Sequence, residues 1–226
     1  MSIRESSGFF CTFDFHFLPF MYTPDRYKKA DRKELLEFIR KNPFGILVIS
    51  DGKKPVATHI PLMLREENGE PILIGHISKE NEQGNLFHDS TEVLAIFQGP
   101  HTYISSSWYS HENVSTWNYI AVHAYGKISV MTELELVEHL ILLTNHFEAG
   151  SEKPKYFENI SPQVVRENIT GIIGFKMTLE KIQANFKLSQ NRNKADHSNI
   201  IHELEKRGDT SSQSVADEMK KHGHQL

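Results

Sequence analysis

The strongest constraint on the fold is a series of short apolar runs separated by polar, turn-prone segments. The first three runs are 44–50, 55–65 and 71–76, with Asp51-Gly52 and residues 66–70 between them. Such spacing is typical of antiparallel strands joined by tight turns. Further runs follow at 92–97, 117–131 and 172–178, the last strand expected, and Gly126 predicts a bulge in the longest. We therefore expect an α+β protein, mainly an antiparallel barrel of about six strands.

Helical periodicity appears in four segments. Asp31 is a natural N-cap for a helix over 31–41, and Asn42-Pro43 ends it, because a residue before proline avoids the α region. Thr132 caps a second helix, 133–148, whose apolar face is expected to contain Leu134, Val137, Leu140, Ile141 and Thr144. Residues 198–207 and 211–221 predict two short helices that pack against the barrel or a second subunit.

The sequence divides into three parts. Residues 1–20 are interpreted as a loosely held extension or the product of an upstream start, because MYTPDRYKKAD from Met21 onward is a plausible natural beginning. Residues 21–186 form the predicted barrel domain. Residues 187–226 form a C-terminal loop and helices.

Composition excludes several classes of protein. The net charge is −4 over 226 residues, which argues against a surface coated with basic residues for nucleic acid. Cys11 is the single cysteine, so a disulfide within the chain and a CxxC motif are excluded, and a reducing cytoplasm is the expected location. A membrane helix needs about 20 apolar residues in a row, and the sequence has no such run. Thirteen histidines lack metal-ligand spacing, so no metal is expected.

Four segments collect side chains suited to a flat, phosphorylated ligand. Residues 75–81 follow a strand and supply a cation, hydroxyls and an amide, which together suit a phosphate. Residues 98–105 crowd aromatic and hydroxyl side chains after a turn expected at Gly99-Pro100. Trp117 and Asn118 could face the plane and the edge of a ring, and residues 187–192 could anchor a phosphate. Each segment also fits an ordinary loop or a core position, so these alternatives stay open.

In their order and their amino-acid sequences, these segments resemble the PaiB family of FMN-binding negative transcriptional regulators. The resemblance covers roughly residues 21–219 and is carried by FQGPHTYIS, TWNY and KLSQNR. It implies a split β-barrel with flanking helices, similar to pyridoxamine-phosphate oxidase. It also implies a homodimer that binds FMN in a cleft between its subunits.

The resemblance also implies which residues contact the cofactor. Three residues of one strand would line the cleft, the 76–81 loop would hold the phosphate, and Gln98 would approach the ring. The partner subunit would supply Trp117 and Asn118, and the 187–190 segment would close the site. The implied set is Thr58, His59, Pro61, His76, Ser78, Lys79, Asn81, Gln98, Trp117, Asn118, Lys187, Ser189 and Gln190. No catalytic residue is assigned.

Two segments depart from the family pattern. Lys79 and Asn81-Glu82 stand where members commonly have arginine and Asn-Pro, and lysine lacks the bidentate geometry of arginine. Asn185 stands at a position that is often basic. Both changes remove contacts to an anionic ligand, so weaker FMN binding or another flavin is expected.

The resemblance favours a regulator, with a flavin-dependent oxidoreductase as the alternative and a flavin carrier or sensor as a third reading. From residue 187 to the end, seven Lys and Arg face six Asp and Glu, which is too little charge for strong binding to DNA phosphates. Direct DNA contact is therefore unsupported by the sequence. His101, Tyr103 and Tyr119 are possible proton donors for an enzyme, although no pair stands out as acid and base.

Overall fold

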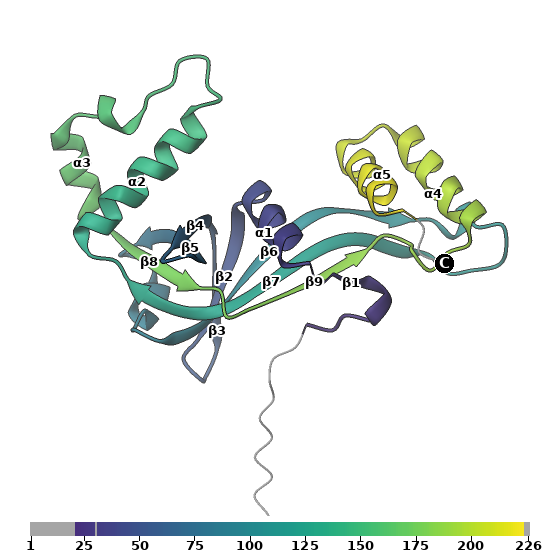
Figure 1. Ribbon diagram of the computed structural model, residues 1–226, viewed down its shortest axis with the longest axis horizontal. Coiled ribbons are helices and arrows are strands. Elements are labelled where there is room, and N and C mark those ends of the chain that lie inside the picture. Colours follow the sequence, from purple (N-terminus) through teal and green to yellow (C-terminus); the bar gives the residue numbers. More distant parts are fainter. Residues whose placement is uncertain (1–20, 30, 224–226) are drawn as a thin grey trace, which may run out of the picture.

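Figure 1 shows a long antiparallel sheet with helices at both ends. The computed structural model describes residues 21–29 and 31–223, so the predicted extension 1–20 lies outside the described residues. The strands are β1 (Lys28–Lys29), β2 (Phe44–Ser50), β3 (Pro55–Pro61), β4 (Met63–Glu67), β5 (Glu70–Ser78), β6 (Thr91–Ile104), β7 (Thr116–Val130), β8 (Ile172–Thr178) and β9 (Lys181–Lys187). The α-helices are α1 (Arg32–Lys41), α2 (Glu133–Glu148), α3 (Pro162–Ile169), α4 (Lys194–Arg207) and α5 (Thr210–His222), and the 3-10 helices include η1 (Asp25–Tyr27) and η2 (Glu82–Leu86).

The chain itself joins the two ends of the main sheet and so closes a barrel. The strand order is β3-β2-β6-β7-β8-β5-β4, with antiparallel neighbours. The end strands β3 and β4 are consecutive in the sequence, and between them lies Leu62, which is fully buried and donates its N–H to the Pro43 carbonyl at 2.7 Å. The run predicted over 55–65 is therefore two strands that meet at a corner. The expected α+β split barrel is confirmed.

Strand β7 exchanges one partner for another at Gly126. Before this residue it pairs with β9, and after it with β8. The crossing is so close that a Cβ on Gly126 would lie 1.7 Å from the Thr178 carbonyl oxygen. Beyond the crossing, residues 98–104 of β6, 116–125 of β7, β9 and β1 form an extension of the sheet that we call the wing.

The predictions of a bulge at Gly126 and of a turn at Gly99-Pro100 are both wrong. The register shift lies in β6 instead, between Gln98 and His101, and the strand continues through it to Ile104. The Phe38 ring packs directly against Gly99, where a Cβ would lie 2.8 Å from Phe38 Cζ. A larger residue at position 99 would displace that ring.

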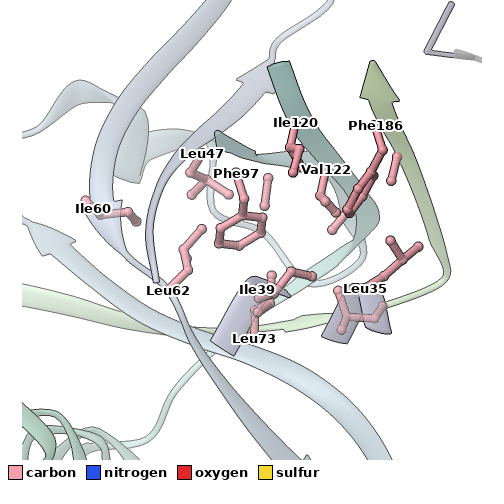
Figure 2. Close-up of a cluster of buried hydrophobic side chains, with 14 of the residues drawn as sticks. Leu35, Ile39, Leu47, Ile60, Leu62, Leu73, Phe97, Ile120, Val122 and Phe186 are labelled. Atoms are coloured by element: carbon pink, nitrogen blue, oxygen red, sulfur yellow. The ribbon is translucent and has the colours of Figure 1, made fainter. Parts of the chain in front are cut away.

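The core lies between the concave side of the sheet and the helices that cover it. Figure 2 shows α1 side chains Leu35 and Ile39 packed among residues of the barrel and of the wing. In Figure 1, α4 and α5 lie above the wing, on the same side of the sheet as α1. Val215 and Met219 of α5 are fully buried in this core.

Two predicted helix starts are confirmed. Asp31 caps α1 by accepting the Glu34 N–H at 3.1 Å, and Thr132 and Glu135 form a reciprocal capping box at α2. The predicted apolar face of α2 is wrong at Leu134, which is 71% exposed, and it omits the two buried positions, Leu136 and His139. The other predicted positions are half-buried. The helix is apolar on several faces, so its sequence does not fix which one meets the sheet.

Strand β9 was not predicted, since 172–178 was expected to be the last strand. The missed strand alternates apolar residues that face the core, such as Ala184 and Phe186, with polar ones. That period-2 pattern is the signal that would have identified it. Helix α3 was missed as well, whereas the two C-terminal helices were predicted and are slightly longer than expected.

Candidate functional site

The face of the sheet opposite α1 and α5, which we call the outer face, runs without interruption from the barrel into the wing. One row of aligned residues crosses five neighbouring strands: His59 on β3, Ile46 on β2, Ile96 on β6, His123 on β7 and Gln183 on β9. Alternate residues of a strand point to the same face. The outer face therefore also carries several apolar side chains that are half-buried in the single chain: Val48, Leu94, Ala121 and Tyr125.

A hollow of about 360 Å³ opens on this face at the base of the wing. Its floor is apolar, Trp117 and Tyr119 form its aromatic side, and its polar rim consists of Gln98 and His101; the remaining lining residues are Ile96, Ile120 and Ala121. Trp117 is 53% exposed, and its ring lies 6.3 Å from that of His101 and 6.1 Å from that of Tyr103. The Gln98 amide lies 3.2 Å from His101 Nδ1. A flat ring would find an apolar floor and polar groups at its edge here.

Two buried polar atoms beside the hollow have no hydrogen-bond partner within the described part of the chain. They are Oδ1 of Asn185 and Nδ1 of His123, on neighbouring strands. The Asn185 amide group donates to the Tyr119 hydroxyl at 2.9 Å, which orients the unpaired oxygen. Burial lowers the pKa of His123, so its ring is neutral at pH 7. Buried polar atoms without partners are rare, and such atoms at a hollow indicate a missing ligand group.

The loop after β5 is fixed against the edge of β3. The Asn81 amide donates to the Thr58 hydroxyl at 2.9 Å, and its oxygen accepts the Gln83 N–H at 3.0 Å. Gln83, fully buried, donates to the Leu47 carbonyl at 2.9 Å. Ser78 and Lys79 are exposed on this loop, and the Ser78 hydroxyl accepts the Glu80 N–H at 3.2 Å. Asn81 is thus the residue of this loop that meets Thr58, whereas Lys79 donates its backbone N–H to the Gly171 carbonyl at 2.8 Å and lines a separate hollow with Leu136 and Ile172.

His76 lies away from this loop, against helix α2. Its Nδ1 is 3.0 Å from Nε2 of His139, which is fully buried. Burial lowers the pKa of His76. Burial, followed by the neighbouring His76 and Arg65, lowers the pKa of His139 to about 4. Both rings are therefore neutral at pH 7, and they share one hydrogen bond. The side chain of His76 is occupied by the helix rather than presented to the outer face.

Three other predicted contacts lie on the inner side of the wing. Asn118 follows Trp117 in β7, so the two side chains point to opposite faces. Asn118 is buried, accepts from the Ser189 hydroxyl at 3.1 Å and donates to the Met219 sulfur at 3.4 Å. Gln190 folds back on its own turn, accepting the Leu188 N–H at 2.8 Å and donating to the Phe186 carbonyl. These side chains hold the turn and α5 in place.

The predicted residues therefore fall into separate groups. His59, Pro61, Gln98, Trp117 and Lys187 share the outer face, and the Asn81–Thr58 hydrogen bond ties the segment that carries Ser78 and Lys79 to its edge. His76, Asn118, Ser189 and Gln190 belong to neither group.

His123 also belongs to the candidate site and was not predicted from the sequence. Its place in β7, two and four residues from Ala121 and Tyr119, is the period-2 signal that could have identified it.

Over 21–29 and 31–223, no three His, Cys, Asp or Glu side chains gather as a metal site would require. None of the helices in these segments combines the length and hydrophobicity needed to cross a bilayer.

Comparison with known proteins agrees with these observations. Residues 21–181 match the model of a family described as a putative FMN-binding domain. A Bacillus subtilis protein named protease synthase and sporulation protein PAI 2 is 41% identical over 199 residues, 88% of this chain and 96% of that protein. An uncharacterised protein of Emericella nidulans is 28% identical over 251 residues, 90% of this chain and 98% of that protein.

Solved structures show the same fold at low identity. The flavocytochrome of Azotobacter vinelandii has a TM-score of 0.55 and 15% identity over 71% of this chain and 69% of that chain. An FAD and heme binding protein of Mycobacterium smegmatis has a TM-score of 0.52 and 14% identity over 71% and 73% of the two chains. The predicted cofactor, FMN, is thereby confirmed at the level of the family.

Proposed function

Because the chain belongs to the PaiB family of putative FMN-binding proteins, we propose that it binds FMN on its outer face, beneath a second copy of the chain, and acts as a negative regulator of transcription. When bound, FMN supplies a flat ring that can exchange electrons. The chain's own residues would bind and orient that ring and exclude water from it.

The observation that carries the flavin proposal is the pair of unpaired buried atoms beside the hollow. A flavin ring has both donors and acceptors along one edge, and Asn185 Oδ1 is an acceptor without a donor. Ile96 and Ala121 offer an apolar surface for the ring itself. The phosphate would lie at the edge of β3, beside the fixed Asn81–Thr58 pair and on the loop that also carries Lys79. Relatives commonly have arginine at position 79 and a basic residue at position 185. In this chain, Lys79 is the cation that the loop after β5 offers to the phosphate.

A second copy of the chain is the proposed cover for this face. Apolar side chains from β2, β6 and β7 lie in one uninterrupted area, and no α-helix of the described residues covers it. Apolar areas of this kind on a soluble protein usually mark an interaction surface. A symmetric dimer would bury the area and would bring Trp117 of each copy towards the cofactor of the other.

The regulatory role rests on the family resemblance. The described residues contribute no element for reading DNA to this argument. The C-terminal helices α4 and α5 are committed to packing on β6: the Ser211 hydroxyl donates to the His101 carbonyl at 2.6 Å, and Arg207 donates to the Tyr103 carbonyl at 2.9 Å. His101 and Tyr103 carry their side chains on the outer face. Regulation through the state of the flavin, or through a partner protein, therefore fits better than direct contact with DNA.

The first test is the visible spectrum and FMN affinity of the purified protein. Lys79→Ala should weaken FMN binding by roughly 1.5–3 kcal/mol and leave riboflavin binding unchanged, because riboflavin has no phosphate. Asn185→Leu should weaken both flavins alike, by about tenfold, because it removes a contact to the ring. Lys53→Ala, in an exposed turn, is the control. A colourless protein that takes up no added FMN would refute the flavin proposal.

An oxidoreductase is the second candidate, favoured by the open hollow with His101 and Tyr119 on its lining. Both side chains can donate protons next to the proposed ring. Anaerobic mixing of the flavin-loaded protein with NADH or NADPH separates the candidates. Rapid bleaching of the flavin supports the enzyme, and an unchanged spectrum supports the regulator, which needs no turnover.

A further inference from the structure

Helices α2 and α3 belong to an arm, residues 133–169, that projects from the barrel at the end opposite the wing (Figure 1). Of the 16 residues of α2, only Leu136 and His139 are buried, and none of the 8 residues of α3 is buried. Leu136 packs against Gly174 of β8, where an added Cβ would lie 2.8 Å from Leu136 Cδ1, and His139 meets His76 of β5. These two contacts define the side of α2 that faces the sheet.

The opposite side of α2 carries a row of apolar side chains that we call the stripe. Its members follow one another at i, i+3, i+7 and i+8: Leu134, Val137, Ile141 and Leu142. This spacing is typical of a helix face that packs against another element. Leu134 is 71% exposed and Leu142 43%, while Val137 and Ile141 are half-buried. The pattern is that of a buried face, but the described part of the chain leaves it largely open, which indicates an interaction surface.

The charge of α2 decides what kind of partner fits the stripe. The helix contains four glutamates and no lysine or arginine. Glu138 follows Leu134 by four residues and Glu148 follows Ile141 by seven, so both carboxylates lie on the same side of the helix as the stripe. Glu138 has a cation of the barrel, Arg65, at 3.7 Å, in a pair that is half-exposed. A partner that covers the stripe must bring cations to these carboxylates, because an unpaired charge is costly to bury.

A second copy of the arm does not have the required charge. Over residues 133–169, seven Glu stand against three Lys and Arg, a net charge of −4 that equals the net charge of the whole chain. Two arms laid together would bring like charges into one interface. The anionic surface of a membrane is disfavoured for the same reason. A partner that is both cationic and apolar is complementary to α2.

We propose that the stripe on α2 is the docking site for an amphipathic helix of another protein, one that carries lysine or arginine beside an apolar face. The apolar face of the partner helix would cover Leu134, Val137 and Ile141. Its cations would pair with Glu138 and Glu148. This inference goes beyond FMN binding and gives the chemistry of a partner protein through which the proposed regulation can act. The stripe shares no residue with the hollow, so the two sites can be tested separately.

The probe is a model peptide of 16 residues, as long as α2, with leucine on one helical face and lysine on the other. Its matched control has glutamate in place of each lysine. The peptides carry a fluorescent label and are titrated with the full chain while their anisotropy is recorded. The lysine peptide should bind at least about tenfold more tightly than the glutamate peptide, because only the lysine peptide complements the charge of α2.

Three variants locate the peptide on the protein. Leu134→Gln should weaken the lysine peptide at least about fivefold, because it removes the most exposed apolar contact of the stripe. Glu138→Gln should weaken it about threefold and make its affinity less dependent on salt. Val114→Gln, at a position on the wing that is 74% exposed, is the matched control and should leave the affinity unchanged. Leu134 and Val114 are both exposed, so neither substitution disturbs the core.

Equal binding of the two peptides, absence of binding, or an affinity that survives in Leu134→Gln would overturn the proposal. Sedimentation equilibrium without peptide tests the second copy as the occupant. Weaker self-association of Leu134→Gln would assign the stripe to contacts between copies of this chain and would also overturn the proposal. The proposed function can fail separately: a protein that takes up no flavin refutes the FMN site, and the peptide titrations of that flavin-free protein still test the stripe.

Discussion

At the scale of single residues, the buried pair His76–His139 makes stability depend on pH. The folded-state pKa of His139 is about 4, below the value of about 6.5 in an unfolded chain. Between about pH 6.5 and pH 4, His139 is protonated in the unfolded chain but remains neutral in the folded chain. Stability that is present at neutral pH is therefore lost as the pH falls from about 6.5 towards 4. His76, whose pKa is also lowered, acts in the same direction.

We predict that His139→Leu removes part of this dependence. In the native protein His139 contributes about 1–2 kcal/mol to the loss of unfolding free energy between pH 7 and pH 5. The variant should lose less stability over that interval, as measured by urea unfolding at each pH. His88→Asn changes an exposed histidine and should behave like the native protein. An identical pH profile in His139→Leu and the native protein would show that the pair does not titrate as described.

Residue types alone do not determine which side chains meet. Trp117 and Asn118 are adjacent in the sequence and were assigned to one site, but the pleat of β7 sends them to opposite faces. His76 has the right chemistry for a phosphate, but its ring contacts His139 of α2. The residues around position 76 in the sequence do not indicate that α2 packs there. Thr58 and Asn81, by contrast, were predicted together and share a hydrogen bond. The difference arises because long-range packing decides the direction of each side chain.

At the scale of elements, the crossing at Gly126 leaves no room for a side chain. We predict that Gly126→Ala destabilises the protein by more than about 3 kcal/mol or prevents folding, because its methyl group would overlap a backbone carbonyl that cannot rotate away. Chemical denaturation measures the loss. Gly150→Ala is the matched control, since nothing lies within 4 Å of its added Cβ. Native-like stability of Gly126→Ala would mean that β8 and β9 cross β7 differently.

The start of helix α2 provides a second test. Thr132 accepts from the Glu135 N–H, and its own N–H donates to the Glu135 carboxylate at 2.8 Å. Lys176 binds the same carboxylate at 2.7 Å, and this hydrogen bond, together with those from Thr132, lowers the Glu135 pKa to about 2. Thr132→Ala should cost about 1 kcal/mol of unfolding free energy. Ser198→Ala, at an exposed position within α4, should change stability little. Equal effects of the two substitutions would contradict the cap.

Most elements could be predicted from local signals, and the exceptions have physical causes. Strand β2 and helix α2 coincide with the predicted ranges, because turns or caps mark both of their ends. Strand β9 was missed because polar residues such as Asn185 weaken the strand signal, although its apolar residues alternate regularly. The corner at Leu62 was also missed, although Pro61 directly before it is a residue that interrupts strands. The apolar residues on both sides of Pro61 gave the appearance of one continuous strand.

At the scale of the whole molecule, the outer face predicts self-association. Val48 lies in the middle of its apolar area, between Ala57 and Leu94 on the adjacent strands. Val48→Glu would place a charge in the proposed dimer interface and should weaken dimerisation at least about a hundredfold. Sedimentation equilibrium measures this constant. Val164→Glu, on exposed α3, should leave it unchanged. A native protein that stays monomeric at micromolar concentration would refute the dimer.

The pairing of β1 with β9 has a consequence for how the protein is made. Lys28 and Lys29 lie near the beginning of the described chain, and their partners Asn185 and Ala184 lie near its end. The wing also needs β9 to pair with β7, and α5 to cover β6. During synthesis the early strands must therefore wait, exposed, until almost the whole chain has left the ribosome.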